Sequence, residues 1–363
     1  MSGDSHTSTP SSPAAAPSTP MPRLHRPSAF EALVQDLVWP MLLRAPRFSV
    51  RPARIGLGAA GVLLVALLWQ LPGLWRTFPR AGSVFESIAE AAPSPLLRAL
   101  SLSGASLSVW GWLALVASAI IFSIVGGSIA RSVATEFALR QRLPWPQALR
   151  FGLLRATSFA ALVLLPAAAF ALAWGFIALF GWAMLTLPVL QVLGGALYFV
   201  PLLVGVAAAA LMVALAFGLP MLAPSLACEG IDAIDSLQRT LAYVVSRPFT
   251  LLLQLALVGV LGVVLVGLAS NVATLAVDAT FATTTATKPA AVALADAPTP
   301  TWSQSSARSL VRTWSHLPGL LVAGLGVSYF FSGGTLLYLS MRHACDGQDP
   351  EELWTNLPGE TSA

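Results

Sequence analysis

The sequence predicts an all-α protein, a polytopic membrane helical bundle with six transmembrane helices. The strongest observation is a stretch of 73 residues, 156–228, without a single Asp, Glu, Lys, Arg or His. Composition agrees, because 56% of the chain is hydrophobic and only 10% is charged, against about 25% charged in soluble domains. A water-exposed surface needs charged side chains, whereas charges are costly inside the hydrocarbon of a bilayer. The chain is therefore expected to lie in a membrane.

Six apolar segments are long enough to cross a bilayer, which takes about 20 helical residues. The predicted spans cover residues 55–71, 107–130, 158–185, 189–219, 250–277 and 317–340. The fourth is longer than a bilayer requires, so we expect it to tilt, to kink at Pro201 or to project beyond the lipid.

The distribution of basic residues predicts the orientation of the spans. Fourteen of the twenty Lys and Arg residues precede the first span or follow the second, fourth and sixth. Because loops rich in Lys and Arg stay in the cytoplasm, this side is predicted to be cytoplasmic. Both termini should then be cytoplasmic, in a bacterial inner membrane. We interpret the scattered arginines as determinants of topology, not as a nucleic-acid-binding surface.

Three shorter parts flank a membrane domain at 55–340. Residues 1–27 are rich in Ser, Thr, Pro and Ala, which predicts a disordered tail without a signal peptide. Residues 28–46 are predicted to form an interfacial amphipathic helix, because Ser28 and Glu31 fit a capping box and apolar residues follow at helical spacing. This helix would either anchor the chain or bind a partner, or it would merely pack against the bundle. Residues 341–363 are predicted to be an acidic tail.

The segments after the second and fourth spans resemble each other at an offset of 88 residues. The coinciding residues are Leu149 and Leu237, Leu153 and Leu241, and Ser158 and Ser246. Pro146 suits the first turn of a helix in the first copy. In the second copy an apolar stripe is formed by Ile231, Ile234, Leu237, Leu241 and Val244. Each copy would be a span, a short cytoplasmic helix and a span, which leaves an internal repeat open.

The second short helix carries the candidate contacts for a partner or for lipid. These are Asp232, Asp235, Arg239 and Arg247. Asp235 and Arg239 are four residues apart in the order that favours an ion pair. Asp232 and Asp235 could be a catalytic carboxylate pair, but acids in the first turn of a helix also complement its dipole, and no His is near in sequence. We therefore assign them no catalytic or metal-binding role.

Polar residues inside the spans are few. Gln254 is the candidate intramembrane polar residue, whereas Gln191 and Asn271 lie near span ends. A hydrogen bond between helices would account for Gln254. Ion-coupled transport is disfavoured, because transporters usually keep ionisable groups within their spans.

No motif predicts a metal, a cofactor or a catalytic residue. His343 and Cys345 precede four acidic residues, but their spacing matches neither a zinc signature nor a calcium loop. Phosphate loops, nucleophile elbows and dinucleotide fingerprints are absent from the sequence. The two cysteines do not indicate a disulfide framework.

Four segments carry a resemblance to known proteins. They are FEALVQDLVWPMLLRAPRF, GGSIAR, EGIDAIDSLQRTLAYVVSRP and YLSMRHACDGQDPEELW. They resemble an uncharacterised family of bacterial multi-pass membrane proteins, and the third is distantly similar to the membrane region found beside some glycerophosphodiester phosphodiesterases. The resemblance implies the membrane architecture alone, because the phosphodiesterase domain with its metal ligands is missing from this sequence.

These observations predict a non-catalytic membrane scaffold or a subunit of a membrane complex. The alternative is a permease or lipid-handling transporter, and a membrane-embedded enzyme comes third. The expected partners are the lipid bilayer and a membrane protein or a second copy of the chain, with no nucleic acid.

Overall fold

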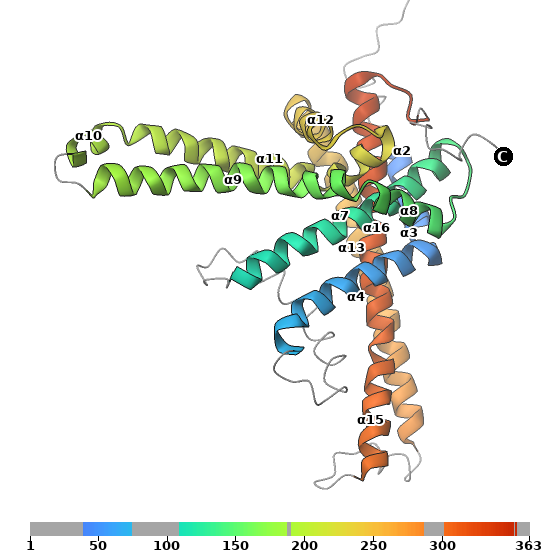
Figure 1. The fold of residues 1–363 in the computed structure, drawn as a ribbon. Coiled ribbons are helices and arrows are strands. Elements are labelled where there is room, and N and C mark those ends of the chain that lie inside the picture. Colours follow the sequence, from blue (N-terminus) through green and yellow to red (C-terminus); the bar gives the residue numbers. More distant parts are fainter. Residues whose placement is uncertain (1–38, 75–108, 187–189, 287–300, 352, 354–363) are drawn as a thin grey trace, which may run out of the picture. The chain divides into compact units, whose positions relative to one another are not determined.

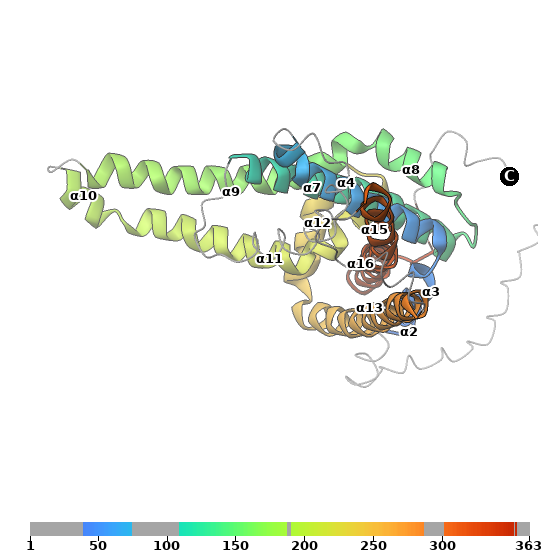
Figure 2. The ribbon, with the colours of Figure 1, turned by 90° about the horizontal axis from the view of Figure 1, so that it is seen from below.

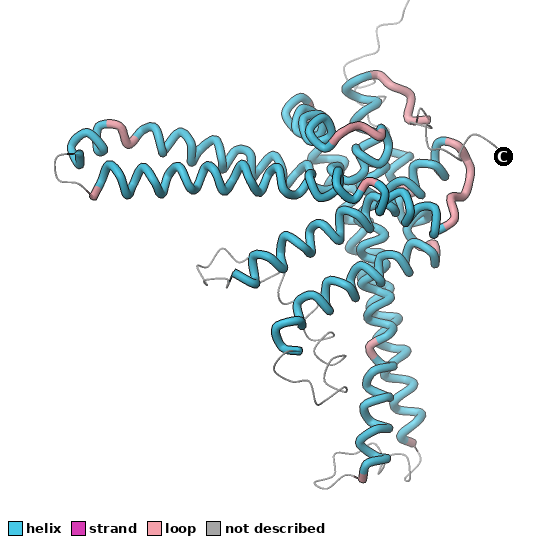
Figure 3. The backbone as a smooth tube through the Cα atoms, in the orientation of Figure 1, coloured by secondary structure: helices cyan, strands magenta, loops and turns pink. Residues whose placement is uncertain are grey.

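The computed structural model describes residues 39–74, 109–186, 190–286, 301–351 and 353. Helices account for 89% of these residues, and no strand occurs among them (Figures 1 and 3), which confirms the all-α class. In chain order the helices are α2 (Trp39–Leu42), α3 (Ala45–Ser49), α4 (Pro52–Leu74), α7 (Val109–Ala138), α8 (Trp145–Leu154), α9 (Ala156–Leu185), α10 (Leu190–Ala196), α11 (Phe199–Glu229), α12 (Ala233–Ser246), α13 (Pro248–Thr285), α15 (Trp302–Ser315) and α16 (Leu317–Asp346).

Six helical stretches are long and apolar enough to cross a membrane, so the predicted number of spans is confirmed. They are Pro52–Leu71, Trp110–Ala138, Ala156–Met184, Phe199–Glu229, Pro248–Thr285 and Trp302–Asp346. The fold class is that of a multi-pass helical membrane protein.

The fourth span differs from the prediction at both ends. Its helix α11 begins at Phe199, after the separate short helix α10, and continues to Glu229. Pro201 therefore lies in the first turn, where a proline costs no backbone hydrogen bond. The prolines inside α11 are Pro220 and Pro224. Gly230 ends the helix in the left-handed conformation, with φ of 62° and its N–H bonded to the Leu226 carbonyl.

The segment predicted as a loop before the last span is partly helical. Helix α13 continues to Thr285, and α15 begins after Thr301, which forms a capping box with Gln304. No residue of α15 is buried.

Short helices connect the spans on the side predicted to be cytoplasmic. The first, α8, joins α7 to α9, and the second, α12, joins α11 to α13. Pro146 lies in the first turn of α8, as predicted. The order of span, short helix and span thus occurs twice, as the proposed repeat requires.

The last helix, α16, is the main packing partner of the others. It contacts α3, α4, α7, α11 and α13, and its residues from Ser328 to Arg342 are almost all buried. The views agree that α13 and α16 lie side by side, as do α9 and α11 (Figures 1 and 2). Close approach depends on glycines: a Cβ on Gly126 of α7 would lie 2.1 Å from the Phe331 ring of α16, and one on Gly127 would lie 2.0 Å from the Phe159 ring of α9.

Burial is uneven among the spans. In α9 no described side chain after Leu162 is buried, and in α11 none is buried between Pro201 and Gly218. The last turns of α11, in contrast, are buried from Met221 to Cys228 except for Leu222. The protein core therefore lies at the ends of the spans that the charge distribution predicts to be cytoplasmic.

Two predicted flanking parts fall at the edges of the described residues. Residues 28–38 lie outside them, and 39–46 contain two short helices separated at Leu43 and Arg44. Met41, Leu42 and Ala45 are buried in the protein core. At the other end, α16 continues past residue 340 to Asp346, so the segment predicted as an acidic tail begins as helix.

Candidate functional site

Glu229 is the centre of the most polar region in the core. It ends α11, and its side chain is only 8% exposed. The Tyr338 hydroxyl of α16 donates a hydrogen bond to its Oε1 atom, and Arg239 Nη1 of α12 lies 2.5 Å from its Oε2 atom. Arg342 Nη1, also from α16, lies 4.0 Å from Oε1. These four residues, the Glu229 cluster, join three helices through one carboxylate.

The Glu229 carboxylate has two guanidinium groups as neighbours, those of Arg239 and Arg342. Burial disfavours the charged form of Arg239, but the Glu229 carboxylate together with the Tyr338 and Tyr243 hydroxyls outweighs this effect and raises the pKa of Arg239. Both carboxylate oxygens of Glu229 have partners, so the group is held as an acceptor. The carboxylate thereby joins α11 to α12 and α16.

A second tyrosine extends this network to the end of α16. The Tyr243 hydroxyl of α12 donates to an Asp346 carboxylate oxygen, and its ring centroid lies 6.0 Å from that of Tyr338. Burial raises the pKa of Tyr243, and the hydrogen bond to Asp346 raises it further. The pair ties α12 to the last turn of α16.

Arg131 and Arg155 both lie close to the Phe151 ring of α8. Arg131 is fully buried, donates to the Ala227 carbonyl at 3.3 Å, and places its guanidinium 5.3 Å from the ring centroid. Arg155 donates to the Gly230 carbonyl at 2.6 Å. Burial lowers the pKa of Arg155, as does the charge of Arg131, whereas Asp232 opposes the change. Both arginines bind carbonyls at the C-terminal end of α11, where free carbonyls favour a cation.

A separate ion pair joins the first two spans. Arg51 and Arg54 both contact the carboxylate of Glu136 at the end of α7, with Arg54 Nη2 at 2.7 Å from Oε2. Arg54 is buried and also donates to the Phe48 carbonyl at 2.6 Å and the Ser132 carbonyl at 2.9 Å. We call Arg51, Arg54 and Glu136 the Glu136 cluster.

Hydroxyl groups line the contact between α11 and α12. Ser225 and Ser236 share a hydrogen bond of 2.6 Å, and Thr240 lies 3.5 Å from the Ser225 hydroxyl. Ser236 and Thr240 are fully buried. The buried face of α12 therefore combines these hydroxyls with Ala233, Tyr243 and Val244, whereas the predicted stripe lies partly outside it, with Ile234 55% exposed.

The candidate contacts on α12 occupy different environments. Asp232 and Asp235 are exposed, and Asp232 precedes α12 without a side-chain cap hydrogen bond. Arg239 pairs with Glu229 instead of Asp235. Arg247 follows the end of α12 and is half-buried. The structure thus brings only Arg239 into the Glu229 cluster.

Gln254 is buried in α13, with 1% of its surface exposed. Within the part of the chain that the structure describes, neither side-chain amide atom has a hydrogen-bond partner. Because an unpaired buried amide is costly, the predicted hydrogen bond between helices does not account for Gln254 within these residues.

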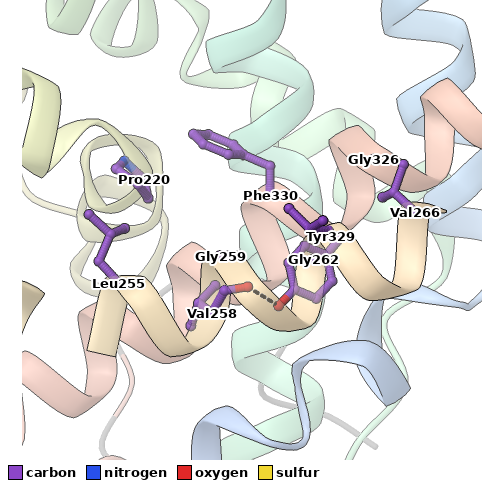
Figure 4. A pocket seen from close by; sticks show the side chains of 10 residues that line it. Pro220, Leu255, Val258, Gly259, Gly262, Val266, Gly326, Tyr329 and Phe330 are labelled. Atoms are coloured by element: carbon purple, nitrogen blue, oxygen red, sulfur yellow. Dashed lines mark hydrogen bonds between the residues drawn. The ribbon is translucent and has the colours of Figure 1, made fainter. Parts of the chain in front are cut away.

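A groove of about 330 Å³ lies between α11, α13 and α16 (Figure 4). Its lining includes Pro220, Leu255, Val258, Gly262 and Phe330, all without polar side chains. The hydroxyl of Tyr329, also in the lining, donates to the Val258 carbonyl at 2.6 Å, as the dashed line in Figure 4 marks. The groove is therefore apolar, and Gln254 is not among its lining residues.

Across residues 39–74, 109–186, 190–286, 301–351 and 353, no group of three or more His, Cys, Asp or Glu could hold a metal. The His343 ring nitrogen Nδ1 lies 3.0 Å from the Gln348 carbonyl, and Arg342 donates to the Asp349 carbonyl at 2.9 Å. These contacts fold the start of the C-terminal segment back onto α16.

Sequence reasoning missed the role of the charges at the span ends. Arg54, Arg131 and Arg342 contribute to the predicted topology, yet each is at most 3% exposed within the protein. Glu229 stands out only as the residue that ends the uncharged stretch. The residues near Glu229 in the sequence, Gly230 and Arg239, do not predict that residues 338 and 342 also contact it.

Comparisons of the chain with protein-family models, with curated proteins and with solved structures found no match. The fold and the charged clusters therefore define the class, a six-span helical membrane protein whose core lies at one end of its spans.

Proposed function

We propose that the chain is a non-catalytic membrane scaffold or a subunit of a membrane complex, placed in a bacterial inner membrane with both termini in the cytoplasm. The observation that carries this proposal is the pair α9 and α11. These helices lie along each other, yet outside their core ends they bury almost nothing against the rest of the chain. Leu172, Trp182 and Leu203 are 75%, 69% and 63% exposed.

This hairpin leaves most of its apolar surface without contacts to the rest of the described chain. Helix association in membranes depends on close packing and on hydrogen bonds, because lipid is as apolar as the helices themselves. The last turns of α11 show that this chain can pack a helix tightly where it has partners. The free length of α9 and α11 is suited to helices of another protein or of a second copy.

The charged clusters support a structural role. Glu229 and Glu136 each hold arginines from another helix, and the Tyr338 and Tyr243 hydroxyls are bonded to carboxylates. These groups fix helices to one another, which a scaffold needs.

A lipid-handling transporter is the second candidate. The apolar groove beside Tyr329 favours it, because a lining that is apolar except for the Tyr329 hydroxyl suits an acyl chain. No charged side chain lines the groove, and the Tyr329 hydroxyl is bonded to the Val258 carbonyl. The groove therefore has no group to hold a charged headgroup, and we rank this function below the scaffold.

Photocrosslinking in native membranes tests the scaffold. A photoreactive amino acid replaces Leu172 of α9 or Leu203 of α11, and the matched control replaces Val272 of α13, which is 65% exposed. We expect discrete protein adducts, with a partner or a second copy, from the two hairpin positions and none from Val272. Adducts with lipid alone at Leu172 and Leu203 would contradict the scaffold and favour lipid handling.

A further inference from the structure

The connections of α8 and α12 place both helices at the membrane surface. A single residue separates α8 from the span α9, and a single residue separates α12 from the span α13. These residues are Arg155 and Arg247. Because each span enters the bilayer directly after its short helix, the C-terminal end of each short helix must lie at the headgroup level.

Helix α8 has three distinct sides. Ala148, Phe151 and Gly152 are buried against the protein. Trp145, Leu149 and Leu153 form the apolar edge of α8, which spans about 80° at 3.6 residues per turn. Trp145 and Leu153 are 56% and 58% exposed. The opposite side carries Gln147 with Leu154 beside it, and Arg150 lies about 60° from Leu153 toward that side; all three are exposed.

Helix α12 repeats this pattern. Its buried side includes Ser236, Thr240 and Tyr243. Ile234, Leu241 and Val245 form the apolar edge of α12, which spans about 40°, and Val245 is 74% exposed. Asp235 and Ser246 lie on the third side of α12, away from both the buried side and the apolar edge, and both are exposed.

The two helices have the same handedness. Viewed along either helix from its first residue, the apolar edge is reached from the buried side by turning in the same direction, by about 110–130°. The 88-residue offset also pairs Leu153 with Leu241, one from each edge. A helix on a membrane surface needs this arrangement, with protein on one side, lipid beneath and water above.

Charge at this level favours anionic lipid over neutral lipid. Arg142 before α8 and Arg150 within it are exposed. Arginines beside an apolar helix edge are attracted to anionic headgroups, by about 1 kcal/mol for each residue near the surface.

We infer that α8 and α12 lie in the headgroup region of the bilayer, with their apolar edges in contact with phospholipid acyl chains and with Arg142 and Arg150 in contact with anionic phosphates. Asp235 and Gln147 then face water. This placement depends on the six spans and holds for a scaffold and for a lipid-handling protein alike.

Spin labels on the full-length protein in nanodiscs test the inference. In a background of Cys228→Ala and Cys345→Ser, single cysteines replace Leu153 or Val245 on the apolar edges. The matched controls are Gln147→Cys and Asp235→Cys on the polar sides of the same helices. Power saturation measures the ratio of accessibility to oxygen, which enters lipid, over accessibility to a polar nickel chelate. We expect this ratio to be several-fold higher at Leu153 and Val245 than at the two controls.

Two results would overturn the placement in lipid. Equal ratios at edge and control positions would mean that the edges face water. Exclusion of both reagents at Leu153 and Val245 would mean that protein covers them, either a partner or a second copy. All four sites are exposed, so the labels should not disturb folding, which the melting temperature of each variant checks.

Lipid composition separates the contribution of charge. Changing the nanodiscs from phosphatidylcholine to phosphatidylglycerol should raise the ratio at Leu153, because α8 is drawn closer to the anionic surface. The variant Arg142→Gln/Arg150→Gln should lose this rise while it keeps the difference between Leu153 and Gln147. An unchanged rise in the double variant would overturn the role of these two arginines.

Discussion

At the scale of single residues, the dominant feature is the dependence of several buried groups on one carboxylate. The Arg342 guanidinium is 4% exposed and the Tyr338 hydroxyl is buried, and both have Glu229 as a neighbour. Removal of one member from a buried charge pair costs more than the pair contributes, because the remaining groups lose their partner without regaining water. Glu229 should therefore be far more sensitive to substitution than its position at a helix end suggests.

Glu229→Gln should destabilise the protein by about 2–3 kcal/mol, because a neutral amide cannot balance the buried Arg342. Unfolding in mixed micelles of mild detergent and dodecyl sulfate measures the change. Asp235→Asn is the matched control, since Asp235 is an exposed carboxylate of the neighbouring helix, and it should change stability little. Equal effects of the two substitutions would show that the Glu229 cluster contributes no stability.

Tyr243 should make stability depend on alkaline pH. Burial raises its pKa in the folded protein, whereas an unfolded tyrosine titrates near about pH 10. The unfolded chain therefore releases this proton first, so the stabilisation is complete below about pH 10 and is lost as the pH rises toward the folded pKa.

Tyr243→Phe should lower the melting temperature at pH 8, because Asp346 loses its hydroxyl donor. The variant should also show a smaller decrease in melting temperature than the wild type between pH 9 and about pH 11. Tyr198→Phe, at a tyrosine that is 54% exposed, is the control and should leave both unchanged. If the melting temperature of Tyr243→Phe decreases as steeply with pH as that of the wild type, other groups cause the loss of stability at alkaline pH.

At the scale of helices, α4 and α16 touch through their backbones. A Cβ on Gly324 would lie 2.6 Å from the Ile55 carbonyl oxygen and 2.7 Å from the Ala59 nitrogen. Backbone atoms cannot swing aside as a side chain does, so a methyl group here would push the helices apart. A Cβ on Gly319 of the same helix, in contrast, would have no such neighbour within 4 Å.

Gly324→Ala should therefore destabilise the protein by about 1–3 kcal/mol, as overpacking does in tightly packed cores. Gly319→Ala in the same helix should be neutral or slightly stabilising, because alanine favours helix over glycine. Thermal unfolding of both variants, followed by circular dichroism, makes the comparison. A Gly324→Ala protein as stable as Gly319→Ala would mean that α4 and α16 are not held at this distance.

The sequence predicts α8 and α12 but not the sides on which they pack. Apolar periodicity predicts that Ile234, Leu237 and Leu241 share a stripe, and they do, but this stripe is only partly buried. Ser236 and Thr240 are buried instead, because the Ser225 hydroxyl of α11 satisfies them. Periodicity identifies an apolar side, and it does not distinguish burial in protein from contact with lipid.

At the scale of the molecule, the six spans follow from the sequence and the Glu229 and Glu136 clusters do not. Long uncharged segments predict spans because the cost of charge in lipid acts on each segment alone. The ion pair between Arg54 and Glu136 joins residues 82 apart, and the bond between Glu229 and Tyr338 joins residues 109 apart. One sequence contains no signal that selects these partners from the other charges at span ends.

The alternation of the spans has a direct test in intact cells. Single cysteines replace Gln238 of α12 and Thr283 near the end of α13, both exposed, in the background without Cys228 and Cys345. A membrane-impermeant maleimide should label Thr283→Cys from outside and Gln238→Cys only after the cells are opened. Labelling of both positions from the same side would contradict an odd number of crossings between them.

The dependence of the core on its final helix bears on how the protein is made. Arg54 can meet Glu136 as soon as the second span is synthesised, and Arg239 follows Glu229 by ten residues. Tyr338 and Arg342 emerge from the ribosome only after five spans have entered the membrane. Until then, the interior positions of α4, α7 and α11 face lipid, and the hydroxyls and charges at their ends have no cover. A chain interrupted before α16 would thus leave the Glu229 carboxylate without Tyr338 and Arg342, so the last helix to be made completes the core.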